Sequence, residues 1–178
     1  MLEKDIFAGF GGQGVLLMGQ LLAYAAMIED KQVSWLPSYG PEMRGGTANC
    51  SVIISDKQVA SPIVEYPSAL IVMNRPSLDK FENTIVSGGK LFINSSIIDR
   101  KATREDIDVY YVPCNDIALE MGDARVANVI MLGAYQAVTN SVSVESLMDA
   151  LLHKLGERKA HLMPINREAF AKGAAIVK

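Results

Sequence analysis

The chain has 178 residues, of which 49% are hydrophobic and 7% aromatic, and its formal net charge is -3 at pH 7. This composition predicts one globular domain over residues 1–178 and excludes a disordered chain, and the absence of a basic run argues against a nucleic-acid partner. No apolar stretch reaches the about 18 residues of a membrane span, and a charged N-terminus leads directly into an apolar run, so we expect a cytoplasmic chain with no membrane partner.

The first predicted element is a buried strand at Asp5–Ala8, followed by a glycine cluster and a long apolar run from Val15 to Ile28. An apolar run that ends in glycines is typical of a buried strand, and the uncharged run after it is typical of a buried helix. Gly9, Gly11 and Gly14 fit the pattern G-x-G-x-x-G, which lets the backbone turn tightly and lets a ligand approach main-chain amides. Unpaired N–H groups at the start of such a helix favour an anion, typically phosphate or carboxylate.

A dinucleotide site is one interpretation of this turn, and it meets a difficulty. In an NAD site, an acidic residue about 20 positions further on, at the end of the second strand, binds the ribose hydroxyls. We place the second strand at Gln32–Leu36, and Glu29 and Asp30 precede it. The glycine turn therefore indicates an α/β fold rather than a particular cofactor.

A polar segment, Pro37–Gly46, follows the second strand and contains two prolines and three glycines. This composition excludes helix and strand interiors, so we expect a shaped loop. Because ligands meet doubly wound sheets at the carboxyl ends of strands, this loop and the glycine turn should lie side by side. Its side chains favour a binding surface, with Arg44 suited to hold a carboxylate or phosphate, over a solvated loop in which Glu42 and Arg44 pair. Arg125 and Asn128 are expected either to face the same crevice or to serve helix capping and packing.

The other strands are predicted at Thr47–Ser55, Gln58–Ser61, Ala69–Met73, Lys90–Asn94 and Asp108–Val112. A turn at Asp56 and Lys57 joins the first two of these into the one β-hairpin of the fold. The other helices are predicted at Pro76–Phe81, Asp116–Met121 capped by Asn115, Ala124–Thr139 capped by Asp123, Val144–Leu155 started by Ser143, and a short last helix through Ala175 after Pro164 and Asn166. This order predicts an α/β fold, a single Rossmann-like domain with a mostly parallel twisted sheet flanked by helices.

Metal binding and nucleophilic catalysis find little support in the residue pattern. His153 and His161 are the only histidines, and no H-E-x-x-H or clustered cysteine pattern accompanies them. Cys50 and Cys114 have no basic neighbour in the sequence and are expected to behave as buried small hydrophobes. We therefore assign no catalytic residue and no metal ligand.

Two motifs carry a resemblance to a known family: GFGGQGV at Gly9–Val15 and SYGPEMRGG at Ser38–Gly46, followed by the strand that begins at Thr47. Together they resemble the gamma subunit of the 2-oxoacid:ferredoxin oxidoreductases, the pyruvate/ketoisovalerate oxidoreductase gamma family. The likeness runs along nearly the whole chain, and the segment Pro41–Gly46 is more similar to the 2-oxoglutarate and branched-chain 2-oxoacid members than to the pyruvate members. The resemblance implies a subunit of a complex, of 2-oxoglutarate synthase type, that oxidatively decarboxylates a 2-oxoacid, transfers the acyl group to coenzyme A and reduces ferredoxin.

The resemblance also implies a division of labour among the subunits. Thiamine diphosphate, Mg²⁺ and iron–sulfur clusters are expected in partner alpha, beta and, where present, delta subunits, since two isolated cysteines do not ligate a four-iron cluster. This chain is then expected to be inactive alone and to support assembly and the access path of coenzyme A. The implied residues near coenzyme A phosphates, or else pressed against the alpha subunit, are Gly9, Gly11, Gly12, Gln13, Gly14 and Arg44. The implied partner contacts are Ser38, Tyr39, Gly40, Pro41, Glu42, Met43, Gly45 and Gly46.

Two other interpretations stay open at this point. A stand-alone NAD(P)- or flavin-binding Rossmann oxidoreductase is motivated by the glycine turn alone. The indolepyruvate oxidoreductase beta subunit shares that turn, and neighbouring genes would separate it from the first interpretation.

Overall fold

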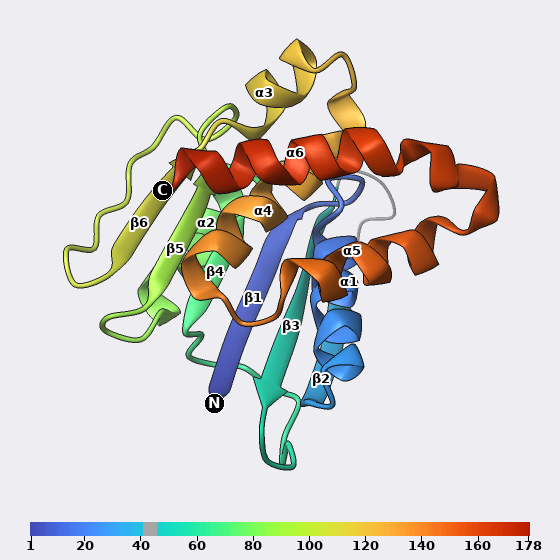
Figure 1. Ribbon diagram of the computed structural model, residues 1–178. Coiled ribbons are helices and arrows are strands. Elements are labelled where there is room, and N and C mark those ends of the chain that lie inside the picture. The colour runs from blue at the N-terminus through green and yellow to red at the C-terminus, as the bar shows by residue number, and fades with distance from the viewer. Residues whose placement is uncertain (41–45) are drawn as a thin grey trace.

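The computed structural model describes residues 1–40 and 46–178. In this part of the chain six strands form one sheet in the order β2-β3-β1-β4-β5-β6, with helices packed against it (Figure 1). The strands are β1 (Leu2–Phe10), β2 (Gln32–Tyr39), β3 (Thr47–Ser55), β4 (Ala69–Val72), β5 (Lys90–Asn94) and β6 (Asp108–Val112). Only β3 runs against the others, between β2 and β1. The predicted α/β fold, with a mostly parallel sheet and one antiparallel hairpin, is confirmed.

The position predicted for the hairpin is wrong. The antiparallel hairpin is β2–β3, and residues Gln58–Ser61 form no strand. β3 is paired with β2 on one side and with β1 on the other, from Leu2 opposite Ser55 to Phe10 opposite Thr47. Because both edges of β3 are occupied, the residues after it have no partner strand beside it.

The second strand is longer than predicted and extends through Pro37 to Tyr39, where a loop was expected to begin. Pro37 lies opposite Cys50 of β3. β2 is an edge strand of the sheet. An edge strand tolerates a proline, because one of its sides has no partner strand and needs no N–H donor there. Composition alone therefore placed the strand end three residues too early.

Helices cover the two faces of the sheet unequally. The helices are α1 (Val15–Ile28), α2 (Arg75–Phe81), α3 (Cys114–Glu120), α4 (Ala127–Thr139), α5 (Val144–Leu155) and α6 (Met163–Ile176), with short 3-10 turns η1 (Glu82–Thr84), η2 (Ala124–Val126) and η3 (Glu157–Leu162). In Figure 1, α6 crosses in front of the sheet together with α4, α5 and α1, whereas α2 lies behind it. The helical layer on the front face is thus the thicker one.

Alternation along the strands explains the two layers. Phe7 of β1 and Phe92 of β5 belong to the core cluster beneath α1, α4, α5 and α6. Their neighbours Ile6 and Leu91 belong to a second, smaller cluster that includes Leu78 of α2. Successive strand residues point to opposite faces, so these strands are buried on both sides, as is typical of parallel sheets.

The predicted helix starts are confirmed at two positions and wrong at two. The side chains of Asp123 and Ser143 accept hydrogen bonds from Arg125 N and Ser146 N and so cap η2 and α5. Asn115 is no cap, because α3 begins at Cys114 and the Asn115 side chain instead accepts a hydrogen bond from Asn94 Nδ2 at 2.8 Å. The last helix begins at Met163, so Pro164 and Asn166 lie within it, with proline in the first turn, where its missing N–H costs nothing.

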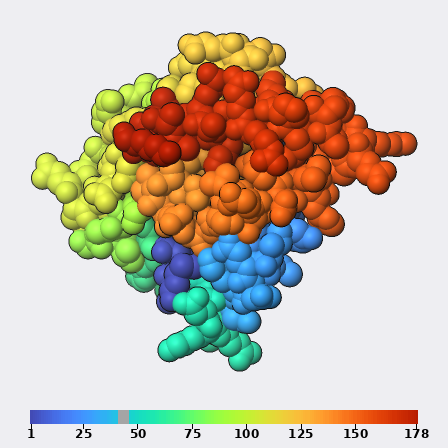
Figure 2. All heavy atoms as spheres, viewed as in Figure 1, coloured from blue at the N-terminus to red at the C-terminus, as the bar shows by residue number. Residues whose placement is uncertain are grey.

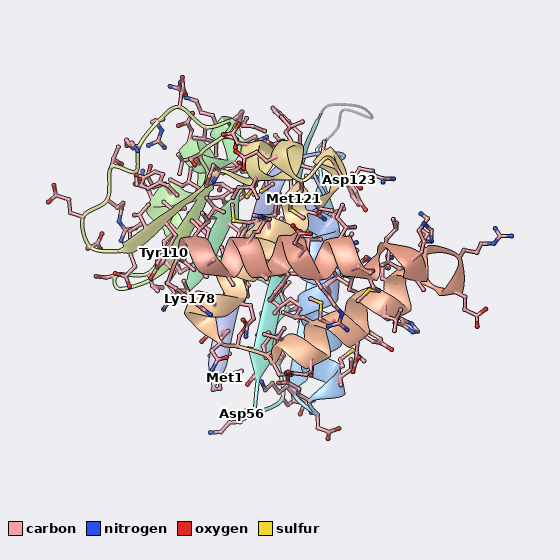
Figure 3. The ribbon with its side chains drawn as sticks, turned by 45° about the horizontal axis from the view of Figure 1, so that its top comes forward. Met1, Asp56, Tyr110, Met121, Asp123 and Lys178 are labelled. Carbon is pink, nitrogen blue, oxygen red and sulfur yellow. The ribbon has the colours of Figure 1, made fainter. Side chains whose placement is uncertain are left out.

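The space-filling view shows α5 and α6 forming much of the front surface, with the segment after β3 projecting at the opposite end from α3 (Figure 2). That projecting end is the amino edge of the parallel strands, where the N-terminus pairs with Asp56 (Figure 3). No helix in residues 1–40 and 46–178 has the length and apolar character needed to cross a membrane.

Candidate functional site

The glycine turn connects β1 to α1 at the carboxyl edge of the parallel strands. Gly12 and Gly14 have positive φ values of 91° and 77°, a conformation that favours glycine. Gly14 is the N-cap of α1 and supplies no side-chain cap. A Cβ on Gly14 would lie 2.8 Å from Cγ of Asn128, so both the backbone and the close contact require glycine here. Gly11 and Gly12 are exposed, whereas Gly9 is buried beneath the turn.

The predicted proximity of the two loops is confirmed for the residues that the structure describes. Gly11 N donates a hydrogen bond to Gly46 O at 3.0 Å, and Gly40 N donates to Thr47 O at 2.8 Å. Although β3 separates β1 from β2, both loops reach the same edge because β2 and β1 run in the same direction. Ser38 and Tyr39 belong to β2 and are exposed there.

Five residues of the second loop lie outside the described part of the chain: Pro41, Glu42, Met43, Arg44 and Gly45. The predicted binding role of Arg44 and the alternative pairing of Glu42 with Arg44 therefore stay predictions.

A hollow of about 340 Å³ opens beside the glycine turn. Its lining comes from the glycine turn, from the starts of α1, α3 and α4, from η2, and from the residue just after β4: Gly12, Gln13, Gly14, Leu17, Met73, Asn115, Ala124, Arg125, Ala127 and Asn128. We call this hollow the glycine-turn hollow. Asp123, which is two residues before Arg125, lies at the same edge of the sheet as the hollow, far from Met1 and Asp56 (Figure 3). The expectation that Arg125 and Asn128 face the crevice of the glycine turn is confirmed.

The electrostatics of the glycine-turn hollow favour an anion. The N-termini of α1 and α4 both border it, and neither helix has an acidic residue in its first turn or a side-chain cap. The partial positive charge at a helix N-terminus and its unpaired N–H groups attract anions. Arg125 places a guanidinium, 78% exposed and paired with Asp123, at the rim.

Arg125 is held at the rim by Asp123. Its Nε and Nη2 donate to the two carboxylate oxygens of Asp123 at 2.8 and 2.7 Å. Hydrogen bonds from the Arg125 side chain and backbone lower the pKa of Asp123 to about 2. The pair is thus fully ionised near neutral pH, and an incoming anion competes with Asp123 for the guanidinium.

Asn128 is a polar side chain that packs against the turn. Only 7% of the residue is exposed, and its carboxamide packs over Gly14. We find no hydrogen bond from this carboxamide to another group within the described ranges. Because Asn128 lines the hollow, its carboxamide is available to a ligand there.

A second, smaller hollow of about 180 Å³ continues from the first and shares Leu17, Arg125 and Asn128 with it. The remaining lining residues are mostly apolar: Val126, Val129, Leu151, Leu155 and Leu162. Three polar residues, Asp123, Lys159 and Asn166, complete the lining. The two hollows together suit an elongated ligand with an anionic part near the glycine turn and a less polar part along α5 and η3.

Sequence analysis missed the structural role of the Gln13 side chain. Its Oε1 accepts a hydrogen bond from Phe10 N at 2.6 Å, and its Nε2 donates to Met73 O at 2.9 Å. Both polar atoms are therefore engaged by the protein. The contribution of Asn115 to the lining was also missed, and in each case the signal lies in a contact between residues distant in sequence.

The two cysteines are buried thiols, as predicted. Burial raises the pKa of Cys50 to about 12, and its Sγ donates to Val15 O at 3.5 Å. Burial also raises the pKa of Cys114 above its ordinary value. Because the thiolate is the reactive form, neither thiol is set up as a nucleophile. The described residues contain no group of three or more histidine, cysteine or acidic side chains arranged to hold a metal, and this donor set does not fit an iron–sulfur cluster.

Comparison with known proteins matches residues 4–176 to the family described as pyruvate ferredoxin/flavodoxin oxidoreductase. The ketoisovalerate oxidoreductase subunit VorA of Methanothermobacter marburgensis is 41% identical over 168 residues, which cover 94% of this chain and 35% of VorA. The chain thus spans about a third of that relative's length. The 2-oxoglutarate synthase subunit KorC of Methanocaldococcus jannaschii is 36% identical over 183 residues, which cover 99% of this chain and 95% of KorC.

Solved structures share the fold. The keto/oxoacid ferredoxin oxidoreductase gamma subunit from Geobacter sulfurreducens superposes with a TM-score of 0.83 at 33% identity, covering 98% of each chain. The 2-oxoglutarate:ferredoxin oxidoreductase from Magnetococcus marinus, solved with 2-oxoglutarate, coenzyme A and succinyl-CoA bound, superposes with a TM-score of 0.91 at 24% identity, covering 99% of this chain and 31% of the other.

Proposed function

Because the chain belongs to the pyruvate ferredoxin/flavodoxin oxidoreductase family, we propose that it is the gamma-type subunit of a 2-oxoacid:ferredoxin oxidoreductase, of the 2-oxoglutarate synthase type. Such a complex oxidatively decarboxylates a 2-oxoacid, transfers the acyl group to coenzyme A and passes two electrons to ferredoxin, in the cytoplasm. Alpha and beta subunits, with a delta subunit in some complexes, hold thiamine diphosphate, Mg²⁺ and the iron–sulfur clusters. This chain supports the assembly and contributes to the coenzyme A site.

The single observation that carries this proposal is the glycine-turn hollow. Coenzyme A is elongated and carries a diphosphate and a 3′-phosphate at one end. The starts of α1 and α4, together with Arg125, offer that end a positive environment. Asn128 offers a buried carboxamide, and the adjoining apolar hollow offers room for the rest of the molecule.

The residues predicted near coenzyme A divide into two groups in this proposal. Gly11, Gly12 and Gly14 present backbone to the hollow or its rim, and Arg44 is proposed to reach the same rim from the second loop. Gly9 lies beneath the turn and acts through the packing of the turn. The exposed Ser38 and Tyr39 with the rest of the second loop are proposed to contact the alpha subunit.

The choice of 2-oxoglutarate rests on KorC, which matches this chain over nearly the whole length of both. The match to VorA, which covers 94% of this chain but 35% of VorA, supports a branched-chain 2-oxoacid as the alternative substrate. A stand-alone NAD(P) enzyme gains no support, since β2 ends in Ser38 and Tyr39 rather than in the acidic residue that binds a ribose.

Co-expression with the alpha and beta chains encoded beside it tests the proposal. We expect the three chains to elute together from a sizing column and to reduce ferredoxin in the presence of coenzyme A and one preferred 2-oxoacid among 2-oxoglutarate, 3-methyl-2-oxobutanoate and pyruvate. If this chain elutes alone and the other two are fully active without it, the proposed function is wrong.

A further inference from the structure

The ladder between β1 and β4 stops in an unusual way at the glycine turn. Ala8 of β1 pairs with Val72 of β4, and Met73 N donates to Ala8 O at 2.9 Å. In a regular parallel ladder the next hydrogen bond would join Phe10 N to Met73 O. Here the carboxamide of Gln13 lies between these two groups, accepting from Phe10 N at 2.6 Å and donating to Met73 O at 2.9 Å.

The Gln13 carboxamide thus takes the place of a peptide group inserted between two strands. On the other side of β1, Phe10 is still paired with Thr47 of β3, so the sheet opens only toward β4. Gln13 and Met73 both line the glycine-turn hollow. The insertion therefore separates β1 from β4 where the hollow begins.

Gly9 provides the room for this insertion. A Cβ at Gly9 would lie 2.6 Å from Oε1 of Gln13 and 3.0 Å from Cβ of Met73. The φ of Gly9 is not positive, so its backbone conformation alone does not require glycine. The first glycine of the G-x-G-x-x-G pattern therefore serves the Gln13 side chain.

The turn is held from both of its ends. Gln13 N donates to Phe10 O at 3.2 Å, which closes the turn, and Gly11 N donates to Gly46 O at 3.0 Å. With its side chain fixed as well, Gln13 determines where Gly14 and the first amides of α1 point. Since each polar atom of its carboxamide already makes one hydrogen bond to the protein, Gln13 influences a ligand chiefly through this backbone.

We propose that Gln13 is a positioning residue, whose carboxamide replaces one rung of the β1–β4 ladder and thereby aims the amides at the start of α1 into the glycine-turn hollow. This inference rests on the proposed function, in which that hollow receives the phosphates of coenzyme A. The expectation that Gln13 also contacts the cofactor directly stays a separate prediction.

The role requires a donor and an acceptor on one planar group. In Gln13→Glu, an ionised carboxylate still accepts from Phe10 N but repels the carbonyl oxygen of Met73. When protonated, the same carboxyl group donates to Met73 O and regains both contacts. Gln13→Met keeps a similar length and loses both contacts at every pH.

The test uses the assembled complex of alpha, beta and this chain, with KM for coenzyme A and kcat measured from about pH 5.5 to about pH 8.5. We expect Gln13→Glu to raise KM about tenfold at the alkaline end, the size of losing about one net hydrogen bond, with little change in kcat. Its KM should return toward the wild-type value as the pH falls. Gln13→Met should raise KM at all pH values, and Gln20→Glu, a matched charge change further along α1, should leave KM unchanged.

Hydrogen exchange of the amides in residues 11–15, measured in the same complexes without coenzyme A, separates this inference from the proposed function. Faster exchange in Gln13→Met together with the pH-dependent KM of Gln13→Glu supports the positioning role. Unchanged exchange, or a KM ratio of Gln13→Glu to wild type that does not vary with pH, overturns it. Loss of the proposed function itself would appear in the wild type, as full coenzyme A-dependent activity without this chain.

Discussion

At the scale of single residues, Asp5 has a buried carboxyl group within the core. It is fully buried on β1, and its Oδ2 accepts a hydrogen bond from the Tyr135 hydroxyl at 2.6 Å. Burial raises the pKa of Asp5 from 3.8 to about 8, with Glu3 adding to the rise and Tyr135 opposing it. Between these two pH values the folded chain binds one proton more than the unfolded chain, so stability decreases as the pH rises and levels off above about 8.

Asp5→Asn removes this proton and is expected to flatten the pH dependence. The wild-type contribution has a slope of up to about 1.4 kcal/mol per pH unit, and the variant should lose most of it. The new amide can donate to the Tyr135 oxygen, whose hydroxyl lies 3.2 Å from Ser141 Oγ. Urea unfolding at several values from about pH 5 to about pH 8 measures the slopes. Asp108→Asn, at an exposed carboxyl on β6, is the control, and equal slopes in wild type and Asp5→Asn would contradict the assignment.

Arg125→Ala tests the cation at the rim of the glycine-turn hollow. We expect KM for coenzyme A in the assembled complex to rise about three- to tenfold, a modest effect because the exposed guanidinium is screened by solvent. The increase should shrink at high salt, since the lost interaction is electrostatic. Lys57→Ala, which removes an exposed cation beside Asp56 at the opposite edge of the sheet, should leave KM unchanged. An unchanged KM for Arg125→Ala at low salt would remove Arg125 from the site.

At the scale of elements, α4 and α6 approach each other closely through two glycines. A Cβ on Gly133 would lie 2.8 Å from the carbonyl carbon of Phe170, and one on Gly173 would lie 2.7 Å from the carbonyl carbon of Ile130. Backbone atoms cannot move aside as a flexible side chain does. The two helices therefore pack backbone to backbone across the front face of the sheet.

Gly133→Ala is expected to destabilise the chain by about 1–2 kcal/mol, because overpacking, which costs up to about 3 kcal/mol, forces the two helices apart. The gain in helix propensity from alanine, about 1 kcal/mol, offsets only part of this cost. Chemical denaturation compares the variant with Lys172→Ala, an exposed change on α6 that should stay within about 0.5 kcal/mol of wild type. A Gly133→Ala chain as stable as wild type would show that the helices separate without cost.

Sequence patterns predicted the elements where a local signal marks them. The bounds of α1, β3, β5, β6 and α5 agree with the prediction, because apolar runs lie within the element and capping residues such as Ser143 lie directly beside it. The failures concern pairing: β2 continues through Pro37 because β3 lies beside it, and Gln58–Ser61 is no strand because no edge is open to it. Pairing depends on partners that are distant in sequence, so composition does not contain it.

The same distinction applies to the site. The rule that loops meet at the carboxyl edge of parallel strands correctly brought the glycine turn to the second loop and to Arg125 and Asn128. It did not reveal that Gln13 joins Met73, which lies 60 positions away. A glutamine in a glycine-rich turn has no sequence signature for such a contact, because the contact depends on where β4 ends.

At the scale of the whole molecule, the features suited to an anionic ligand gather at the edge that carries the glycine turn, while another hollow of similar size lies between α1 and α5. None of the described residues supplies a redox centre. Both thiols are buried with raised pKa values, and no metal-binding cluster occurs in the described ranges. In the proposed function, where the glycine-turn hollow receives coenzyme A, the chain is expected to affect the coenzyme A-dependent half of the reaction and not the decarboxylation that precedes it, which depends on a cofactor held elsewhere.

Reconstitution of the complex separates the decarboxylation half of the reaction from the coenzyme A-dependent half. Purified chain added to an alpha–beta preparation should raise coenzyme A-dependent ferredoxin reduction until the chains are equimolar, after which the rate should level off. The slower reduction of a viologen dye by 2-oxoacid alone, without coenzyme A, should change less than about twofold, since it needs no acyl acceptor and the glycine-turn hollow has no part in it. The Arg125→Ala chain should reach the same endpoint at saturating coenzyme A, which separates assembly from ligand binding. If both halves depended equally on the added chain, its role would be to hold the catalytic subunits in an active arrangement, and the hollow would not be the reason that the complex needs it.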